Sequence, residues 1–391
     1  MNEAESAAPS RVPYGHSRPA RLADDAAFPA RDVARVLFMG EQLALPIALL
    51  ASPGGGSGRR FRIGSRTLVA GECFDSYWRF AAERMRIFHQ RAAGMPGPWT
   101  DDPVLGRHKF TNVYRAADRV SQYLIRDVIY TGPQDPEEVV FRVLLFKFFN
   151  RVETWELLCE RLGGMPSWDG YRFGAYERVL GDAMRRGERV YSAAYIVPNP
   201  AFGEARKHGN HLRLIEHAMT AGLPGKVADA AGLREVYELL LGLPSLGPFL
   251  AYQYAVDLAY SAVTRADESQ FVVAGPGALD GISKCFADTG GLPAAEVIAW
   301  MLETSRGHFE RLGLEFTDLW GRWPTLIDWQ NVFCEVSKYT RATHPHVRGV
   351  SGRTRIKQEF RQTPARIDYR FPPRWGLSAE RTARVRPGAG R

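Results

Sequence analysis

The sequence predicts a mainly α-helical fold that consists of many medium-length helices. Apolar residues recur at helical spacing in blocks that begin near 74, 109, 136, 172, 204, 229, 247, 276, 293 and 328. Strand signals are few, and the best short candidate is "ERVYSAAYIV" at 188–197, which also suits a buried helix. A third observation is the turn-forming stretch "LPSLGP", which separates two apolar helical segments and predicts a tight hairpin between helices.

Composition is that of an ordinary globular protein. The 391 residues are 45% hydrophobic and 24% charged, which is enough for one large domain or two modest ones that share a core. No stretch of about 18 uncharged apolar residues is present, and the N-terminus does not resemble a signal peptide. We therefore expect a cytoplasmic protein without a membrane span. The four cysteines are scattered singly, so they indicate neither a disulfide framework nor a metal knuckle.

Charge divides the chain into regions. Residues 341–391 contain 13 basic and 3 acidic residues, a net charge of +10, whereas the whole chain carries +8. Such a concentrated basic segment favours binding to a polyanion, and nucleic acid is the commonest one in cells; the alternative is a solvated tail that aids solubility. We predict an N-terminal extension at 1–70 that is partly disordered, a helical domain at 71–342, and a basic segment at 343–391.

The stretch "KFTNVYRAADRVSQYLIRDVIY" predicts an amphipathic helix. At helical spacing its polar residues share one face, and its valines and leucine lie opposite. This polar face is either simply solvated or, because its groups suit bidentate hydrogen bonding, part of a base-binding pocket. The polar residues are Asn112, Arg115, Asp118, Arg119 and Gln122.

A second helix is predicted to begin at Pro136, where proline and two glutamates suit the first turn. It continues almost entirely apolar to Phe148, Phe149 and Asn150. Paired aromatic rings followed by an amide suit a pocket wall that stacks a base and bonds to its edge. The alternative is ordinary core packing.

The hairpin at 243–248 leaves unpaired N–H groups at the start of the following helix, where a phosphate can bind. The stretch "LPSLGPFLAYQYAVDLAYS" resembles the helix-hairpin-helix of the DNA glycosylase superfamily, although Ser245 replaces the first glycine of its pattern. Together with "FTNVYRAADRVSQYLI", "FNRVETW", "VAGPGALDGI" and "DWQNVFCEVSKY", it resembles the branch associated with hypermodified bases. That branch includes the alpha-glutamyl/putrescinyl thymine pyrophosphorylase group and the helical domain of 5-hydroxymethyluracil DNA kinase. The likeness covers roughly residues 72–342.

This resemblance implies a two-lobed, glycosylase-like helical fold with a central cleft and a flipped base. It implies double-stranded DNA with modified bases as the partner. The implied DNA contacts are Ser245, Leu246, Gly247, Phe249, Arg353, Arg355 and Lys357, and the implied base pocket is Asn112, Arg115, Asp118, Phe148, Phe149 and Asn150. No cofactor, metal or iron–sulfur cluster is expected, and the histidines His208, His211 and His217 do not form a metal-binding motif.

The chain departs from the family at two positions. Gly275 stands where glycosylases carry the catalytic aspartate, so Asp280, Asp328 and Asp257 are the candidate replacements. Asp328 is alternatively a helix cap, and Asp257 a buried acid that fixes a helix. Phe249 stands where strand-cutting members carry a lysine, which implies a monofunctional glycosylase without lyase activity.

From the resemblance we expect a DNA glycosylase that removes a bulky modified pyrimidine, with a glucosylated hydroxymethyl base as one candidate, and leaves abasic sites in antiviral defence. It is similar in this respect to bacterial glycosylases that act on glucosyl-hydroxymethylcytosine. Two alternatives remain open at this point. The first is a base-hypermodification enzyme, a pyrophosphorylase or transferase on a modified thymine, and the loss of the usual aspartate favours it. The second is a non-enzymatic sensor of modified bases.

Overall fold

The computed structural model of the chain describes residues 58–362 and 368–377. Within them the fold is mainly α-helical, as predicted, with one small three-stranded sheet. Most of the predicted N-terminal extension and the last part of the basic segment lie outside the described residues.

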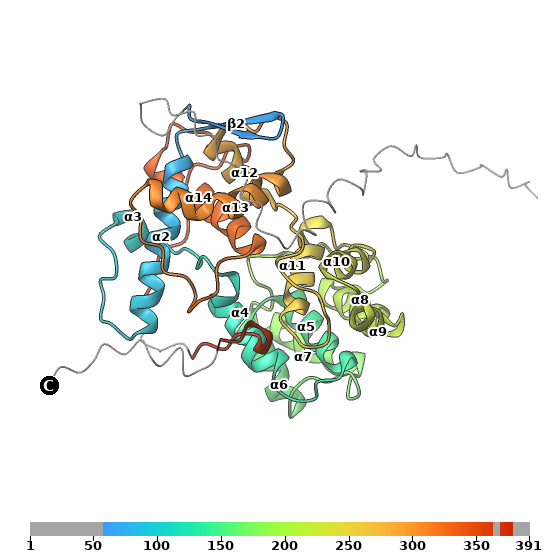
Figure 1. The fold of residues 1–391 in the computed structure, drawn as a ribbon. Helices are drawn as coiled ribbons and strands as arrows, with labels where there is room; N and C mark the ends of the chain where they lie inside the picture. Colours follow the sequence, from blue (N-terminus) through green and yellow to red (C-terminus); the bar gives the residue numbers. More distant parts are fainter. Residues whose placement is uncertain (1–57, 363–367, 378–391) are drawn as a thin grey trace, which may run out of the picture. The chain divides into compact units, whose positions relative to one another are not determined.

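One group of helices packs with the sheet. The strands are antiparallel in the order β1-β2-β3, and Phe61 of β1 contacts the ring of Trp300 on α13. Helix α12 lies along α14 (Figure 1), so closely that a side chain at Gly281 would collide with the backbone of Phe333. The elements are β1 (Arg60–Ile63), β2 (Arg66–Ala70), α2 (Phe74–Ala92), α3 (Pro103–Arg107), α12 (Pro276–Cys285), β3 (Phe286–Asp288), α13 (Ala294–Arg311) and α14 (Leu326–Thr343).

The second group surrounds α5, which is buried from Glu138 to its last residue. Helices α6, α8, α9 and α11 and the π-helical segment η2 all pack on α5, and α10 lies beside α11 (Figure 1). Asp135 caps the start of α5 through its side chain, as expected for a helix that begins at Pro136. The elements are α4 (Arg119–Tyr123), η2 (Leu124–Ile129), α5 (Pro136–Phe149), α6 (Val152–Leu162), α7 (Phe173–Arg185), α8 (Lys207–Thr220), α9 (Leu223–Asp229), α10 (Leu233–Leu241) and α11 (Pro248–Ala259).

The short 3-10 turn η1 (Arg115–Ala117) contacts both groups, because it packs against α4 on one side and α14 on the other. The predicted helix over this region is wrong before residue 119. Asp118 accepts a hydrogen bond from the backbone N–H of Asn112 (2.8 Å), and the Asn112 amide donates to the carbonyl of Ala117 (2.8 Å). These side-chain bonds satisfy an irregular backbone and compete with helix formation. The predicted single polar helix face therefore does not exist at 112–118.

The strand candidate at 188–197 is also wrong, because the segment is irregular and pairs with no strand. Its backbone bonds go to helices instead: the N–H of Ser192 donates to the carbonyl of Phe149 (2.9 Å), and Val190 accepts from the Thr154 hydroxyl (2.8 Å). Tyr195 has a φ of 56°, which a β-strand does not allow. A strand needs a neighbour with free backbone groups, and the helical surroundings offer none.

Residues 368–377, which lie within the predicted basic segment 343–391, form a strap that is docked on the fold. Tyr369 stacks with Phe371, and Phe371 stacks with Trp375. Arg374 donates to buried Glu268 (2.9 Å), which also accepts from Arg322 (2.5 Å). The strap is thus held by aromatic packing and a shared carboxylate.

Replacing Arg374 with alanine should lower the free energy of unfolding by roughly 1 to 3 kcal/mol, because Glu268 is buried and would keep only one cationic partner. The measurement is urea-induced unfolding followed by circular dichroism. Arg361→Ala, at an exposed position ahead of the strap, is the matched control and should change stability by less than about 0.5 kcal/mol. Equal stability of the two variants would show that the strap does not contribute.

Candidate functional site

A buried cluster of charges lies where η1, α5 and α11 meet. Asp257 on α11 accepts hydrogen bonds from both terminal nitrogens of Arg115, at 2.7 and 3.1 Å, and from the ammonium of Lys147 at 3.0 Å. All three side chains are at most 5% exposed. Burial acts to raise the pKa of Asp257, but Arg115 and Lys147 outweigh it and hold that pKa below its usual value. Asp257 is therefore ionised and links three separate segments.

Other donors of the cluster also have acceptors. Arg115 donates through Nε to the side-chain oxygen of Gln253 (2.9 Å), and Lys147 donates to the side-chain oxygen of Asn150 (2.9 Å). Asn150 ends α5 in the left-handed conformation, with φ of 48°, which turns its amide back toward Lys147. Two cations around one anion leave an excess positive charge in a buried place, which favours electron-rich groups nearby.

Two aromatic rings cover this charged cluster. Tyr195 lies with its ring 4.7 Å from the Lys147 ammonium, and the same ring is stacked on Phe249 at a centroid distance of 5.8 Å and an angle of 9°. Burial raises the pKa of Tyr195 to about 12, and the nearby Arg115 charge acts in the opposite direction. The tyrosine is therefore neutral and bridges a cation and an aromatic face.

Phe249 also limits which residues can occupy position 275. A Cβ atom at Gly275 would lie 2.5 Å from the Phe249 ring, so no other side chain fits there without movement of the ring. The resemblance noted in the sequence predicts that Gly275 stands in the place of the catalytic aspartate of glycosylases. The two departures noted in the sequence are thus one structural feature, because the ring of Phe249 occupies the space that a side chain at Gly275 needs.

Residues 190–198 form an arch that carries Tyr195 and is anchored at both ends. At one end Tyr191 stacks on Phe149, and at the other end the carbonyl of Pro198 bonds to His211 Nε2 (3.0 Å). His211 Nδ1 lies 2.9 Å from the Tyr191 hydroxyl, so one histidine of α8 connects the two ends of the arch. Because a carbonyl can only accept, this geometry requires the neutral histidine tautomer with its proton on Nε2.

The predicted base-pocket residues are only partly brought together. Arg115 and Asn150 belong to the cluster around Asp257, whereas Asn112 and Asp118 bond to each other in the loop before α4. Burial raises the pKa of Asp118 to about 7. The two phenylalanines instead face the core: Phe148 contacts His211 and Tyr254, and Phe149 stacks on Tyr191. These residues have the core-packing role that the sequence left open as an alternative.

The three candidate acids occupy different environments. Asp280 accepts from the Ser337 hydroxyl and from the N–H of Ser351 (2.7 Å), where it fixes the chain after α14. Asp328 completes a capping box with Thr325 and accepts from the N–H of Arg115 (3.0 Å). Only Asp257 lies beside the Tyr195 ring system. No observation tests a catalytic role for any of them, so these assignments stay predictions.

Sequence reasoning missed Lys147, Gln253 and Tyr195. The signal for Lys147 was present, since a lone lysine inside the apolar run "VVFRVLLFKFF" must find a buried partner. Gln253 and Asp257 are four residues apart and so share a face of α11. Tyr195 had no comparable signal, because its position depends on the path of an irregular arch.

The hairpin between α10 and α11 has the predicted location. Leu246 is buried and anchors the turn, whereas Gly247 and Pro248 are exposed. Ser245 adopts a left-handed conformation, with φ of 65°, at the place where the family pattern has glycine. The backbone of the hairpin is thus accessible to a phosphate. No observation tests DNA contact by Ser245, Leu246, Gly247, Phe249 or the segment with Arg353, Arg355 and Lys357, so this remains a prediction.

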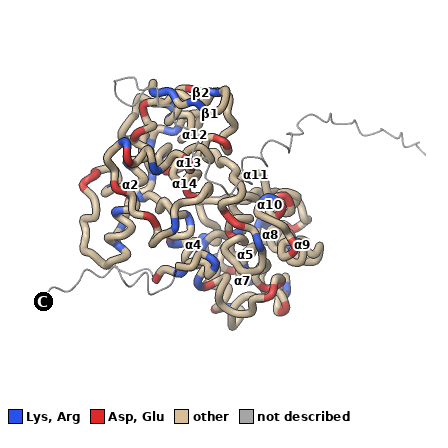
Figure 2. Tube along the Cα trace, viewed as in Figure 1, with Lys and Arg blue, Asp and Glu red and all other residues tan. Residues whose placement is uncertain are grey.

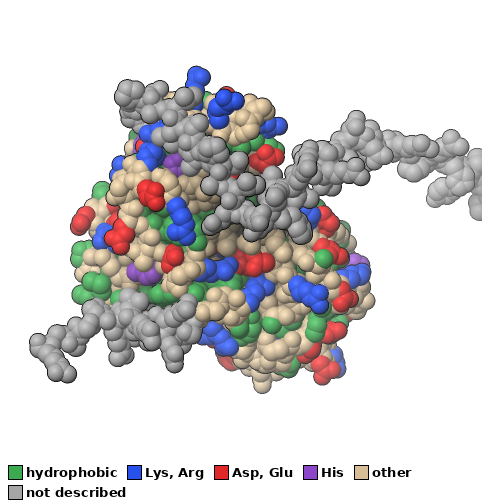
Figure 3. Space-filling model, in the orientation of Figure 1, with side chains coloured by type: hydrophobic (Ala, Val, Ile, Leu, Met, Phe, Trp, Pro, Cys, Tyr) green, Lys and Arg blue, Asp and Glu red, His purple; other side chains and the backbone are tan. Residues whose placement is uncertain are grey.

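Basic residues are not restricted to the C-terminal segment. Arg353, Arg355 and Lys357 are exposed, and exposed arginines also occur on the strands β1 and β2, where Figure 2 shows them in blue. Figure 3 shows basic and acidic side chains intermixed on the face that it displays. Charge alone therefore does not define one DNA-binding surface on that face.

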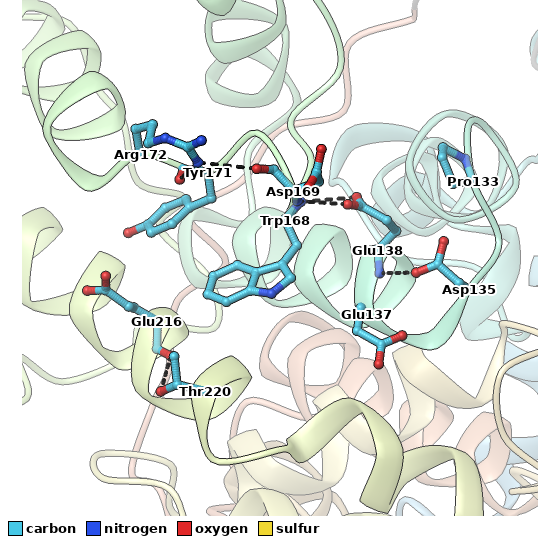
Figure 4. Close-up of a pocket in the computed structure, with 10 residues that line it drawn as sticks. All are labelled: Pro133, Asp135, Glu137, Glu138, Trp168, Asp169, Tyr171, Arg172, Glu216 and Thr220. Atoms are coloured by element: carbon cyan, nitrogen blue, oxygen red, sulfur yellow. Dashed lines mark hydrogen bonds between the residues drawn. The ribbon is translucent and has the colours of Figure 1, made fainter.

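A separate hollow of about 830 Å³ lies near the start of α5 (Figure 4). Its lining is acidic and aromatic, and Glu138 in its wall accepts from the N–H groups of Trp168 (3.1 Å) and Asp169 (3.0 Å). Glu138 and Lys147 are nine residues apart on α5, or about 13 Å along the helix axis. This distance separates the hollow from the charged cluster. The carboxylates that line the hollow repel DNA phosphates. The lining residues are Pro133, Asp135, Glu137, Glu138, Trp168, Asp169, Tyr171, Arg172, Glu216 and Thr220.

Comparison with known proteins identifies relatives of the chain. Residues 71–349 match the family model described as 5-hmdU DNA kinase, helical domain. The chain is 29% identical over 288 residues to a 5-hmdU DNA kinase of Bacillus phage SP10; the match covers 68% of this chain and 44% of that protein. The chain thus spans less than half of the length of this relative. No solved structure matches, and no helix within the described ranges is long and apolar enough to span a membrane.

These findings correct the expected activity. The matching relative is a kinase, and the family model is that of a kinase's helical domain, so the assignment as a monofunctional DNA glycosylase is wrong. The resemblance to the helical domain of 5-hydroxymethyluracil DNA kinase is confirmed, whereas the comparisons do not show membership of the glycosylase superfamily.

Replacing Asp257 with asparagine should destabilise the fold by roughly 3 to 5 kcal/mol, because Arg115 and Lys147 would be left buried without their shared anion. Chemical unfolding of the variant measures this loss. Asp229→Asn, at an exposed position on α9, is the matched control and should cost less than about 0.5 kcal/mol. A loss at Asp257 no greater than in the control would mean that the cluster does not hold the three segments together.

The arch anchor predicts a pH dependence of stability. Burial lowers the pKa of His211 to about 4, whereas an unfolded histidine has a pKa of about 6.5, so the unfolded state binds more protons between these values. The contribution of His211 is complete above about pH 6.5 and is lost as the pH falls toward 4. His211→Gln should show a shallower loss of unfolding free energy from pH 7 to 4 than the native chain. Equal slopes for the variant and the native chain would show that His211 does not contribute to this pH dependence.

Proposed function

Because the chain belongs to the family of helical domains of 5-hmdU DNA kinases, we propose that it is a DNA base-hypermodification enzyme that acts on a 5-hydroxymethylated pyrimidine in duplex DNA. The observation that carries this proposal is the family match over residues 71–349, which includes the cluster around Asp257, the arch and the hairpin. The phage relative is named a 5-hmdU DNA kinase, and this name suggests the substrate class, 5-hydroxymethyluracil in DNA.

The geometry at Gly275 supports modification of the base over its removal. Base excision needs a carboxylate close to the sugar to stabilise an oxocarbenium-like transition state. At the position that matches this carboxylate, the ring of Phe249 excludes any side chain. A site without that group can hold the nucleotide without promoting cleavage of the bond between base and sugar.

The proposed DNA contacts are sequence-independent. The exposed backbone of the hairpin before α11 suits a phosphate at a helix N-terminus, and Pro248 in the first turn leaves the other N–H groups free to donate. Arg353, Arg355 and Lys357 add positive charge on an exposed segment. These contacts supply affinity, and selectivity for the base comes from the aromatic and charged groups around Lys147.

The sequence has no P-loop signature for binding a phosphate donor. Gly225-Lys226 is the only Gly-Lys pair in the chain, and Val227 follows it. The phosphate-binding P-loop signature needs Ser or Thr after this pair and a further glycine five residues before the paired one. The printed sequence does not contain that signature.

The test compares duplexes of one sequence that contain a single thymine, 5-hydroxymethyluracil or 5-hydroxymethylcytosine. The chain should bind the 5-hydroxymethyluracil duplex at least about tenfold more tightly than the thymine duplex, a difference of about 1.4 kcal/mol. Fluorescence anisotropy at fixed salt measures the affinities, because phosphate contacts make them salt-dependent. Heating the same samples in alkali should reveal no broken strands, since the base stays attached.

Equal affinity for the three duplexes would contradict the proposed substrate class. Alkali-labile sites at the modified base would contradict the proposed reaction class. Arg353→Ala combined with Arg355→Ala serves as a control, because it should weaken binding to all three duplexes by a similar factor and leave the preference unchanged.

A further inference from the structure

We propose that the ring of Tyr195 occupies a slot for a single-ring nucleobase, and that the arch at 190–198 withdraws this ring when an extruded pyrimidine enters. The inference rests on the proposed function and deepens it, since it names the position of the base and the group that the base displaces. Tyr195 would then act as an internal substitute for the base while no DNA is bound.

The slot offers two partners to a pyrimidine. The Phe249 ring lies parallel to the Tyr195 ring, at 9° and 5.8 Å between centroids. The ammonium of Lys147 lies 4.7 Å from the centroid of the Tyr195 ring. A pyrimidine stacks on an aromatic face as a tyrosine ring does, and its carbonyl oxygens are groups that accept hydrogen bonds from an ammonium. These oxygens give a pyrimidine an interaction that the carbon atoms of the tyrosine ring cannot make.

The groups that surround the Tyr195 ring are held by other parts of the fold, so withdrawal of Tyr195 does not require the charged cluster to open. Lys147 is held by Asp257 (3.0 Å) and by Asn150 (2.9 Å), and Asp257 is held by Arg115. Phe249 is fixed from behind, because its ring lies against Gly275 on α12. Groups that are positioned before the ligand arrives bind it at a lower entropic cost.

The middle of the arch, in contrast, has few backbone anchors. Ser192 is bonded to the carbonyl of Phe149, and Pro198 is bonded to His211, but residues 193–197 make no backbone–backbone hydrogen bond. The N–H of Ala194 donates only within the arch, to the Ser192 side chain (3.1 Å). Ala193, Ala194 and Ile196 are exposed, whereas Val197 is buried and belongs to the anchored end. Tyr195 has a positive φ of 56°, a conformation that is unfavourable for an aromatic residue. Movement of residues 193–196 therefore breaks no backbone–backbone hydrogen bond.

The size of the slot favours single-ring bases. The Tyr195 ring that now takes this space is a single six-membered ring, which is the size of a pyrimidine ring. Substituents at the 5-position of the base are distinguished by the polar groups around the slot.

The test removes the tyrosine ring. Tyr195→Ala should bind the free nucleoside 5-hydroxymethyl-2′-deoxyuridine at least about tenfold more tightly than the native chain, because the nucleoside no longer displaces a ring. Its affinity for deoxyadenosine should stay unchanged. Ile196→Ala, on the same arch but away from the slot, is the matched control and should bind both nucleosides as the native chain does. Isothermal titration calorimetry measures all six affinities, for the native chain and both variants with each nucleoside.

A second measurement uses the full chain with its arch intact. With 3-fluorotyrosine at position 195, the fluorine resonance should shift to that of a solvent-exposed ring when duplex DNA containing 5-hydroxymethyluracil is added. An unchanged resonance upon saturation with this DNA would overturn the slot, even if Tyr195→Ala does not fold. A Tyr195→Ala variant that folds but gains no affinity for the pyrimidine nucleoside would overturn it as well.

The two proposals fail in different ways. If the native chain prefers the modified duplex but Tyr195→Ala gains no nucleoside affinity, the slot is wrong and the proposed function stands. If the native chain shows no preference among duplexes while Tyr195→Ala gains affinity for pyrimidine nucleosides, the slot is right and the proposed substrate class is wrong.

Discussion

The ionised carboxylate of Asp257 is the constraint on which the rest of the site depends. It is buried beneath the second helical group, and it is stable there only because Arg115 and Lys147 donate to it from separate parts of the chain. Arg115 belongs to the turn η1, which packs on both α4 and α14, so the ion pair links α11 to a turn that contacts both helical groups. Lys147 carries the same constraint to the end of α5 and thereby to the ring of Tyr195.

Much of the helical framework was predictable, because apolar periodicity reports which residues face a core. Helix α5 begins at Pro136 and α12 at Pro276, as the sequence indicates, and the hairpin before Pro248 lies where its turn residues place it. The prediction failed at 109–118, where the Asp118 carboxylate and the Asn112 amide replace helical backbone bonds. Local polar residues decide such segments through specific partners, and a periodicity of apolar residues contains no information about those partners.

The candidate site was less predictable for the same reason. Arg115 and Asn150 were chosen for their hydrogen-bonding groups, and both belong to the cluster, but Phe148 and Phe149 satisfy the same pattern while packing in the core. A pair of aromatic residues at the end of a buried helix does not reveal whether the rings line a pocket or pack in the core. Tyr195 could not be found from periodicity at all, since its position follows from anchors at both ends of an irregular arch. Contacts between residues distant in sequence determine such positions.

The packing of Phe249 against Gly275 links two departures of this chain from the glycosylase pattern that its sequence resembles. In this chain the ring of Phe249 takes the volume that a carboxylate at position 275 needs, and the same ring provides a stacking surface for Tyr195. Exchanging a carboxylate for an aromatic face removes the group that stabilises positive charge on a sugar and adds one that holds a planar ring. Under the proposed function, such a site would hold the base in place while it is modified. The glycine at position 275 and the stacking surface for Tyr195 thus belong to one packing arrangement.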